Sequence, residues 1–329
     1  MRDALALTWT EHRRTTGLCA GLDLELVVIR AKNRGALRYL FASVRTIALL
    51  LRRRPDVLLV PNPSLVLATL AILLRPILRY RLVVDAHNEA VVPFIHQQCW
   101  LRRVSRWVVS KADLTIVSNR LLAAAVEEQG GRPFTLPDRI PEPPIASVGV
   151  ASVGKLQGAF NAVLISTFAP DEPVLGVLEA VRGTSIDLYV TGDYCKLGLS
   201  TRQNVPRNVH LTGFLPEAEY WKLLRSADAI VDLTLMENCL VCGAYEALAL
   251  GKPMLLSNNR ASVEFFGDSA LYTDNAPDDI RRMLGQVQSE HGRLVRGAAV
   301  KRAELVVSWA ARAADLTDRL REWQGARPE

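Results

Sequence analysis

The chain has 329 residues, enough for two α/β domains, and its composition of 49% hydrophobic and 22% charged residues is that of a globular protein. No segment reaches the roughly 18–20 apolar residues that a membrane span needs, and Glu11–Arg14 interrupts any signal-peptide core, so we expect a cytoplasmic protein. Five cysteines without framework spacing exclude a disulfide scaffold. Cys239 and Cys242 form a lone CxxC without a nearby histidine, which predicts buried thiols and not a zinc or redox site.

The first part of the chain alternates predicted strands with predicted helices, the pattern of a parallel α/β sheet. We predict strands at 4–9, 23–29, 57–60, 81–85 and 114–117, and helices at 36–51, at 64–74 and up to Gln129. No GxGxxG follows the first strand, which disfavours a nicotinamide or flavin enzyme. The loop there carries Arg13 and Arg14, predicted contacts for a phosphate or the acceptor, with a solvated basic turn as an equal alternative.

Charge is distributed unevenly along the sequence. Residues 1–146 hold 21 basic against 12 acidic residues, a net +9, whereas the remainder carries −3. Arg38, Arg45 and Arg52 are spaced by seven and share one stripe of a predicted amphipathic helix, and later arginines are interleaved with Trp100 and Trp107. This mixture favours contact with a membrane surface that carries anionic lipid. A solvated basic face is the alternative, and no nucleic-acid-binding signature is present.

A boundary rich in proline and small residues separates a second α/β domain. We place the linker at 133–154. Beyond it we predict strands at 162–165, 186–190, 209–214, 229–235, 254–257 and 270–274, with helices at 173–182, from Leu215 and at 240–250. The last helix repeats apolar residues at Trp309, Ala313, Leu316, Leu320 and Trp323, which predicts a packed stripe.

The stretch Val231–Pro253 holds the most informative pattern. A buried strand passes through a polar loop into a helix that ends at Gly251. In open α/β sheets ligands bind where a strand feeds a helix N-terminus, and the partial positive charge of that terminus suits a phosphate. Glu246 lies inside this mostly apolar helix, where a buried carboxylate needs a partner such as a ribose diol. The alternative is a glutamate that faces solvent.

Glu246-Ala-Leu-Ala-Leu-Gly-Lys-Pro253 resembles the donor-nucleotide motif of family-4-type nucleotide-sugar glycosyltransferases with the GT-B fold. Eight residues separate Glu237 from Glu246, where that family has seven, so strict register places Asn238 at the first acid. Asp85-Ala-His-Asn88 and Ser166–Glu172 resemble segments of the lipid-linked β-mannosyltransferases of the same fold class. Family-4-type enzymes often place an Arg and a Lys near the second of these segments, which is acidic here.

The resemblance implies roles for individual residues. A retaining enzyme would use Glu237 or Asn238 at the donor sugar, whereas an inverting one would use His87 as its base. The implied contacts of the donor nucleotide are Glu246, Ser166, Thr167, Gly192, Gly213, Phe214, Cys239 and Leu240. Because no metal-ligand cluster is visible and helix N-termini and arginines can hold a diphosphate, we expect no metal and no cofactor.

These observations predict two Rossmann-like domains facing across a cleft, with the C-terminal helix crossing back to the first domain. The expected domains are 1–145 joined by 306–329, on the acceptor side, and 150–305, which binds the nucleotide sugar. The expected function is transfer of a sugar from a UDP- or GDP-sugar to an acceptor hydroxyl of a lipid-linked or surface polysaccharide precursor. The alternatives are a non-catalytic scaffold subunit that binds a partner glycosyltransferase or lipid, and a nucleotide-sugar 2-epimerase.

Overall fold

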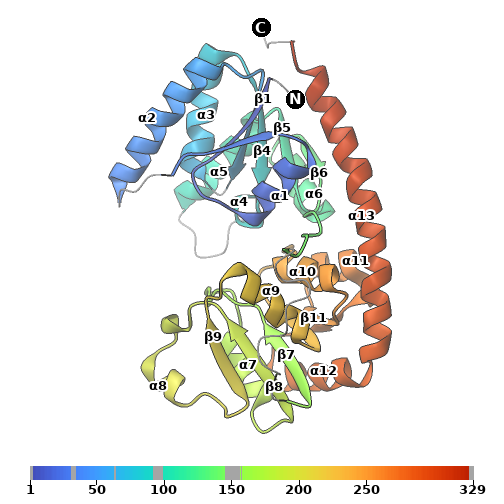
Figure 1. The fold of residues 1–329 in the computed structure, drawn as a ribbon. Coiled ribbons are helices and arrows are strands. Elements are labelled where there is room, and N and C mark those ends of the chain that lie inside the picture. The colour runs from blue at the N-terminus through green and yellow to red at the C-terminus, as the bar shows by residue number, and fades with distance from the viewer. Residues whose placement is uncertain are drawn as a thin grey trace. The chain divides into compact units, whose positions relative to one another are not determined.

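Buried, β-branched and leucine-rich runs form two separate parallel sheets, as a doubly wound α/β chain requires. The computed structural model describes residues 3–30, 35–62, 64–91, 99–144, 156 and 158–325. The chain divides into two compact units, Met1–Arg139 with Val307–Glu329, and Ile140–Val306 (Figure 1). We call them the first and the second unit.

The first unit is built on a six-stranded parallel sheet with the order β2-β1-β3-β4-β5-β6. Its strands are β1 (Ala4–Thr8), β2 (Glu25–Val28), β3 (Val57–Asn62), β4 (Arg81–Ala86), β5 (Leu114–Val117) and β6 (Pro133–Thr135). Its helices are α1 (Arg13–Gly21), α2 (Ala36–Arg53), α3 (Leu65–Leu78), α4 (Asn88–Val91), α5 (Cys99–Lys111) and α6 (Arg120–Glu128).

The second unit has the strand order β12-β11-β10-β7-β8-β9, the arrangement of dinucleotide-binding sheets. Its strands are β7 (Phe160–Leu164), β8 (Ile186–Thr191), β9 (Val209–Gly213), β10 (Ala229–Asp232), β11 (Met254–Ser257) and β12 (Leu271–Thr273). Its helices are α7 (Val174–Val181), α8 (Leu199–Gln203), α9 (Glu217–Ser226), α10 (Cys242–Leu250), α11 (Arg260–Phe266) and α12 (Pro277–Ser289), and α13 (His291–Glu322) starts here. Two short 3₁₀ turns, η2 (Tyr194–Lys196) and η3 (Gly267–Ser269), complete the list.

The strand orders place one switch point in each sheet, between β1 and β3 in the first unit and between β7 and β10 in the second. At a switch point the connections from neighbouring strands leave toward opposite faces of the sheet, which opens a crevice beyond the carboxyl ends of the strands. The loops after β1, β7 and β10 carry most of the residues that the sequence singled out. Most of the candidate functional residues therefore lie at these two edges.

The C-terminal helix returns to the first unit, as predicted. Trp309, Ala313, Leu316 and Leu320 are all buried in one apolar cluster with strands and helices of that unit. The indole of Trp309 donates a hydrogen bond to the carbonyl oxygen of Pro137 (3.0 Å). Its ring lies so close to Gly21 that a Cβ there would be 2.0 Å from a ring carbon. The periodic stripe is thus the second half of the core of the first unit.

Two local predictions were wrong, and several helices were missed. The expected linker contains β6, because Phe134 and Leu136 are buried and proline is tolerated at the first residue of an edge strand. Helix α3 continues through Pro76 to Leu78, where Arg79 caps it in the left-handed conformation, so the proline does not end the helix. Helix α11 was not predicted, although Asn259 caps its first turn. Residues 145–155 of the linker lie outside the described residues.

Among the helices that the structure describes, none is long and apolar enough to cross a membrane.

Candidate functional site

The loops after β7 and β10 are tied together at the switch point of the second unit. Thr234, just beyond β10, donates its hydroxyl hydrogen to Asp171 (2.8 Å), and Leu235 donates its N–H to the Asp171 carbonyl (2.7 Å). Ser257, at the end of β11, accepts from the N–H of Thr234 (2.9 Å). These bonds hold the carboxyl ends of three strands as one rigid edge.

The loop Ser166–Ala169, which we call the 166–169 loop, wraps its polar groups around a carboxylate. Glu172 accepts hydrogen bonds from the hydroxyl of Ser166 (2.6 Å), from the N–H and hydroxyl of Thr167 (2.9 and 2.8 Å) and from the N–H of Ala169 (3.2 Å). Converging amides and hydroxyls of this kind are the donors that bind phosphate in other loops. Ser166 and Thr167 are therefore at the expected edge, but the anion that they hold is an internal side chain.

A cation that the sequence did not single out lies beside this loop. Lys196, in the turn η2 after β8, donates to the carbonyl oxygen of Thr167 (2.6 Å). The two loops approach closely because Gly192 has no side chain: a Cβ there would lie 2.1 Å from the Ser166 carbonyl oxygen, and its φ is +93°. Gly192 is thus needed for the packing of the two loops. No sequence signal marks Lys196, since it lies 30 residues from Ser166.

Helix α10 follows the β10 loop, and its first turn is bonded to a buried acid. Asp232, the last residue of β10, accepts the N–H of Gly243 (2.8 Å), so this amide is not available to a ligand while the bond persists. Burial raises the pKa of Asp232 well above its usual value, and the charges of Glu246 and Glu172 raise it further. A Cβ on Gly243 would lie 2.5 Å from the Asp232 carboxylate.

Glu246 is buried in α10, so the alternative of a solvent-facing glutamate is wrong. Its carboxylate accepts a hydrogen bond from the hydroxyl of Tyr220, on α9. The sequence argument required a partner for this acid and named a ribose diol, and the structure supplies a tyrosine from the neighbouring helix. The contact with ribose is not tested by this arrangement, because a carboxylate has acceptor positions for more than one hydroxyl.

The other predicted donor residues lie along the same edge. Glu237 is exposed in the β10 loop, and Asn238 adopts φ +58°, a conformation that asparagine tolerates well. Cys239 and Leu240 are half-buried, and Cys239 and Cys242 are both free thiols. Cys242 is exposed, so the prediction that both thiols are buried was wrong.

At the end of β9, Gly213 takes φ +73° and the next residue, Phe214, exposes 75% of its surface. An aromatic ring exposed at this edge is suited to stacking on a base. The predicted residues therefore come from the ends of four strands, β7, β8, β9 and β10.

A second group of polar residues lies at the carboxyl edge of the sheet in the first unit. Arg14, near the start of α1, is buried and bonds Asp85 on β4 (2.9 Å from Nε), Asp138 and the carbonyl oxygen of Leu136 (3.3 Å). Burial alone would lower the pKa of Arg14, but the two carboxylates more than offset this and raise it. The structure thus places Arg14 in a buried ion-pair cluster rather than at an open phosphate site. Arg13 is exposed.

His87 adjoins this cluster, two residues beyond Asp85. Its Nε2 lies 3.9 Å from Oδ2 of Asp85, and neither atom has a hydrogen-bond partner within the described part of the chain. Burial lowers the pKa of His87 to about 4, against the raising effect of Asp85. His87 is therefore neutral near pH 7, in the form that can accept a proton.

His12 completes the group and was not among the predicted site residues. Its ring lies edge-on to His87, with centroids 4.6 Å apart. Its Nδ1 accepts the N–H of Arg14 (3.3 Å) and so caps helix α1. Partial burial lowers the pKa of His12 too. The two histidines lie 75 residues apart in the sequence, and only the pairing of β1, β3 and β4 brings them together. Their contact therefore could not be predicted from the sequence.

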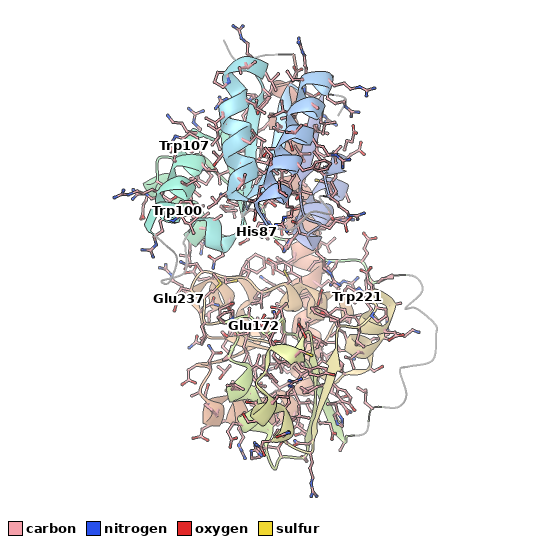
Figure 2. The ribbon with its side chains drawn as sticks, turned by 90° about the vertical axis from the view of Figure 1, so that its left-hand side faces the viewer. His87, Trp100, Trp107, Glu172, Trp221 and Glu237 are labelled. Carbon is pink, nitrogen blue, oxygen red and sulfur yellow. The ribbon has the colours of Figure 1, made fainter. Side chains whose placement is uncertain are left out.

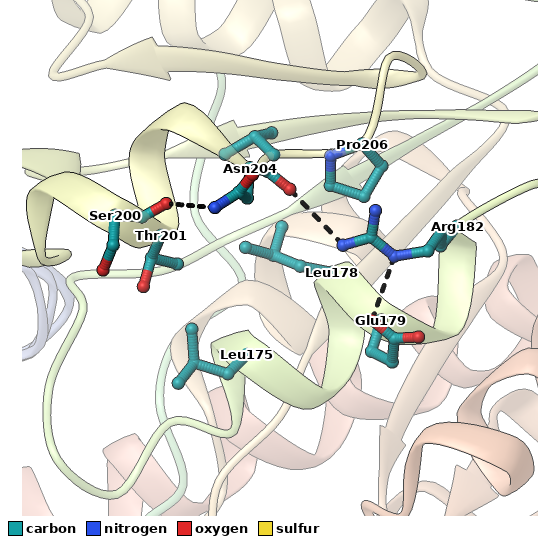
Figure 3. A pocket seen from close by; sticks show the side chains of 9 residues that line it. Leu175, Leu178, Glu179, Arg182, Ser200, Thr201, Asn204 and Pro206 are labelled. Carbon is teal, nitrogen blue, oxygen red and sulfur yellow. Dashed lines mark hydrogen bonds and ion pairs between the residues drawn. The ribbon is translucent and has the colours of Figure 1, made fainter.

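A hollow also lies between α7 and α8, away from these two groups of residues. It has a volume of about 290 Å³ (Figure 3). Its charged groups bond one another: Arg182 pairs with Glu179 (3.0 Å) and donates to the carbonyl oxygen of Asn204 (3.3 Å). Because the lining holds no other charged group beside the hydroxyls of Ser200 and Thr201, we do not assign a function to this hollow.

No protein-family model matches the sequence, and no curated protein matches it. Solved structures do match. Sucrose-phosphate synthase from Thermosynechococcus elongatus superposes with a TM-score of 0.79 at 14% identity, over 99% of this chain and 100% of that one. HepE from Anabaena, in complex with UDP and glucose, gives 0.73 at 13%, over 99% and 100%. A candidate UDP-N-acetylglucosamine 2-epimerase from Listeria monocytogenes gives 0.63 at 12%, over 100% and 99%.

These similarities confirm the predicted fold class. The two parallel sheets of Rossmann type and the glycosyltransferases among the similar structures identify the GT-B fold. Identities of 12–14% show the fold and nothing finer. Activity, substrate and the family-4 type have to be argued from the residues.

Proposed function

We propose that this protein is a metal-independent glycosyltransferase that moves a sugar from a UDP- or GDP-sugar to an acceptor hydroxyl. The observation that carries the proposal is the buried carboxylate of Glu246, held on α10 at the switch point of a GT-B fold. Glu246 is also the first residue of the segment that matches the donor motif of such enzymes. HepE, a protein of the same fold, has been solved with UDP bound, which supports a nucleotide as the ligand.

Each part of the donor has a proposed contact at this edge. Phe214 would stack on the base, and Glu246 would accept the ribose hydroxyls beside the hydroxyl of Tyr220. The diphosphate would take over the donors of the 166–169 loop from Glu172, with Lys196 supplying a positive charge. That exchange requires Glu172 to turn away, because two anions cannot share one set of donors.

The chemical step depends on which residue meets the donor sugar. In an inverting reaction His87, neutral at pH 7, would accept the proton of the acceptor hydroxyl, and the nearby Asp85 would stabilise the resulting imidazolium. In a retaining reaction Glu237 or Asn238 would stabilise the developing charge on the sugar. We favour a lipid-linked saccharide as the acceptor, reached at the inner face of a membrane, because the first unit is basic.

A calorimetric titration of UDP and GDP tests the proposal. We expect one nucleotide to bind the wild type with micromolar affinity and Glu246→Ala to lose at least about tenfold, since hydrogen bonds to a charged group contribute about 1.5–3 kcal/mol. Glu304→Ala, which removes an exposed glutamate on α13, is the matched control and should bind as the wild type does. If neither nucleotide binds the wild type at millimolar concentration, the enzyme proposal is wrong.

One observation favours the second candidate, a non-catalytic scaffold subunit. Glu172 already fills the 166–169 loop, and Asp232 already holds the Gly243 amide, so both phosphate-binding features of the donor edge are internally satisfied. Nucleotide binding separates this candidate from the enzyme, since a scaffold needs none. No feature of the described residues favours the 2-epimerase over either, and the similarity to the Listeria protein rests on the fold alone.

A further inference from the structure

Three neighbouring helices of the first unit carry many cations and no acid. Helices α2 and α5 contain four arginines or lysines each, and α3 contains one arginine. None of the three helices contains an aspartate or a glutamate. Helix α3 packs against both of the others. Figure 2 looks onto this face, with Trp100 and Trp107 labelled on α5. We call it the α2–α3–α5 face.

Helix α2 has two apolar sides, and only one of them packs inside the unit. Ala42, Thr46 and Leu50 are buried. At about 100° per residue, Leu37, Leu40 and Val44 point to the opposite side, and they are among the most exposed apolar residues of the chain, at 65%, 63% and 57%. A helix of a water-soluble protein normally turns one apolar stripe inward and a polar face outward. Helix α2 does not follow this rule.

The arginines of α2 form the border between its two apolar sides. Arg38, Arg45 and Arg52 follow at intervals of seven, which places them on one line. All three are exposed, and none of them forms an ion pair with a carboxylate among the described residues. The guanidinium of Arg45 lies over the ring of Phe41, 4.5 Å from its centre. Such a line of unneutralised cations beside apolar side chains matches the boundary between lipid headgroups and acyl chains.

The neighbouring helices extend the same character. Leu73 and Ile77 of α3 expose 62% and 73% of their surfaces. On α5, Trp100 and Trp107 are exposed, and Arg103 and Arg106 are exposed between them. Tryptophan and arginine are the residues that lie at the headgroup level of a bilayer. The exposed apolar side chains thus gather on three adjacent helices and are not scattered singly.

We infer that the α2–α3–α5 face binds the surface of a bilayer that contains anionic lipid, with the apolar side chains of α2 inserted and its arginines at the phosphates. The absence of acids on all three helices favours an anionic partner, and the line of arginines beside outward-pointing apolar side chains of α2 favours a bilayer, where charged headgroups adjoin acyl chains. The inference deepens the proposed use of a lipid-linked acceptor but stands on residues that take no part in donor binding.

Co-sedimentation with vesicles tests the inference. We expect the full chain to bind vesicles of phosphatidylcholine that contain phosphatidylglycerol and to remain in solution with phosphatidylcholine alone. Leu40→Glu with Val44→Glu should abolish binding. Arg45→Gln with Arg52→Gln should weaken it by about 25-fold, since each of the two cations near an anionic surface contributes about fivefold. All four side chains are exposed, so these variants should fold. Urea denaturation that matches the wild type checks this.

The control variant is Val300→Glu with Val307→Glu, which changes two valines of α13 with exposures of 70% and 72%. It should bind vesicles as the wild type does. Failure of the wild type to bind anionic vesicles overturns the inference, as does equal binding by the variant with changes at Leu40 and Val44. If that variant instead converts a dimer to a monomer, the face binds a second copy and the inference is wrong. UDP binding by the same variants is measured by calorimetry and should equal that of the wild type. This result distinguishes a failure of the membrane inference from a failure of the proposed donor site.

Discussion

A neutral, half-buried His87 makes the stability of the first unit depend on pH in a predictable direction. Its pKa is about 4 in the folded protein, against an ordinary value of 6.5. Below pH 6.5 the unfolded chain therefore takes up a proton at His87 that the folded chain refuses until about pH 4. Stability is fully present above pH 6.5 and is lost as the pH falls through this window.

The size of the loss follows from the two pKa values. Linkage gives about 2 kcal/mol by pH 5 and about 3 kcal/mol by pH 4, a large part of the stability of an ordinary domain. The side chain is 19% exposed, so solvent screening reduces these values only modestly. The same window governs chemistry: as the base of an inverting reaction, His87 would stay active down to about pH 5.

Urea denaturation followed by tryptophan fluorescence is the assay, because five of the six tryptophans belong to the first unit and only Trp221 to the second. His87→Asn is the comparison, since it removes the titrating group and keeps every carboxylate. We expect the free energy of unfolding of the wild type to fall more steeply than that of the variant between pH 7 and pH 4. His12 is present in both proteins, so the difference between the two curves reports His87 together with its coupling to His12. Parallel curves for the two proteins would refute the assignment of a neutral imidazole at His87.

Three further substitutions test the packing and the donor edge. Glu172→Gln should raise the affinity for UDP severalfold relative to uridine in calorimetry, because a competing charge leaves the phosphate donors; an unchanged ratio would contradict that competition. Gly192→Ala should lower the free energy of unfolding by more than about 2 kcal/mol, because a Cβ there meets the Ser166 backbone. The control, Gly251→Ala, has φ +64° but open space around it and should cost about 1 kcal/mol. Equal costs in urea denaturation would show that close packing at Gly192 is unimportant. Trp309→Ala should cost about 3–5 kcal/mol, and a loss below about 1 kcal/mol would show that the terminal helix is dispensable to the first unit.

Much of the fold was readable from local patterns. Strands buried on both faces appear as continuous apolar runs, so every strand of both sheets except β6 was predicted within a few residues. The stripe that starts at Trp309 required only the helical period. Glu246 was marked by a carboxylate inside an apolar helix, and the structure buries it. In each case the signal lies within one continuous segment of the sequence.

The tertiary structure decided what pairs with these segments. Arg14 could be read as a phosphate ligand until the fold placed it between Asp85 and Asp138, which lies 124 residues away. His12 gained a place beside His87 in the same way. Periodicity and propensity report the backbone conformation that a segment prefers and which of its faces is exposed to solvent. Which charged group neutralises another depends on strand order and on burial, and these arise only when the whole chain packs.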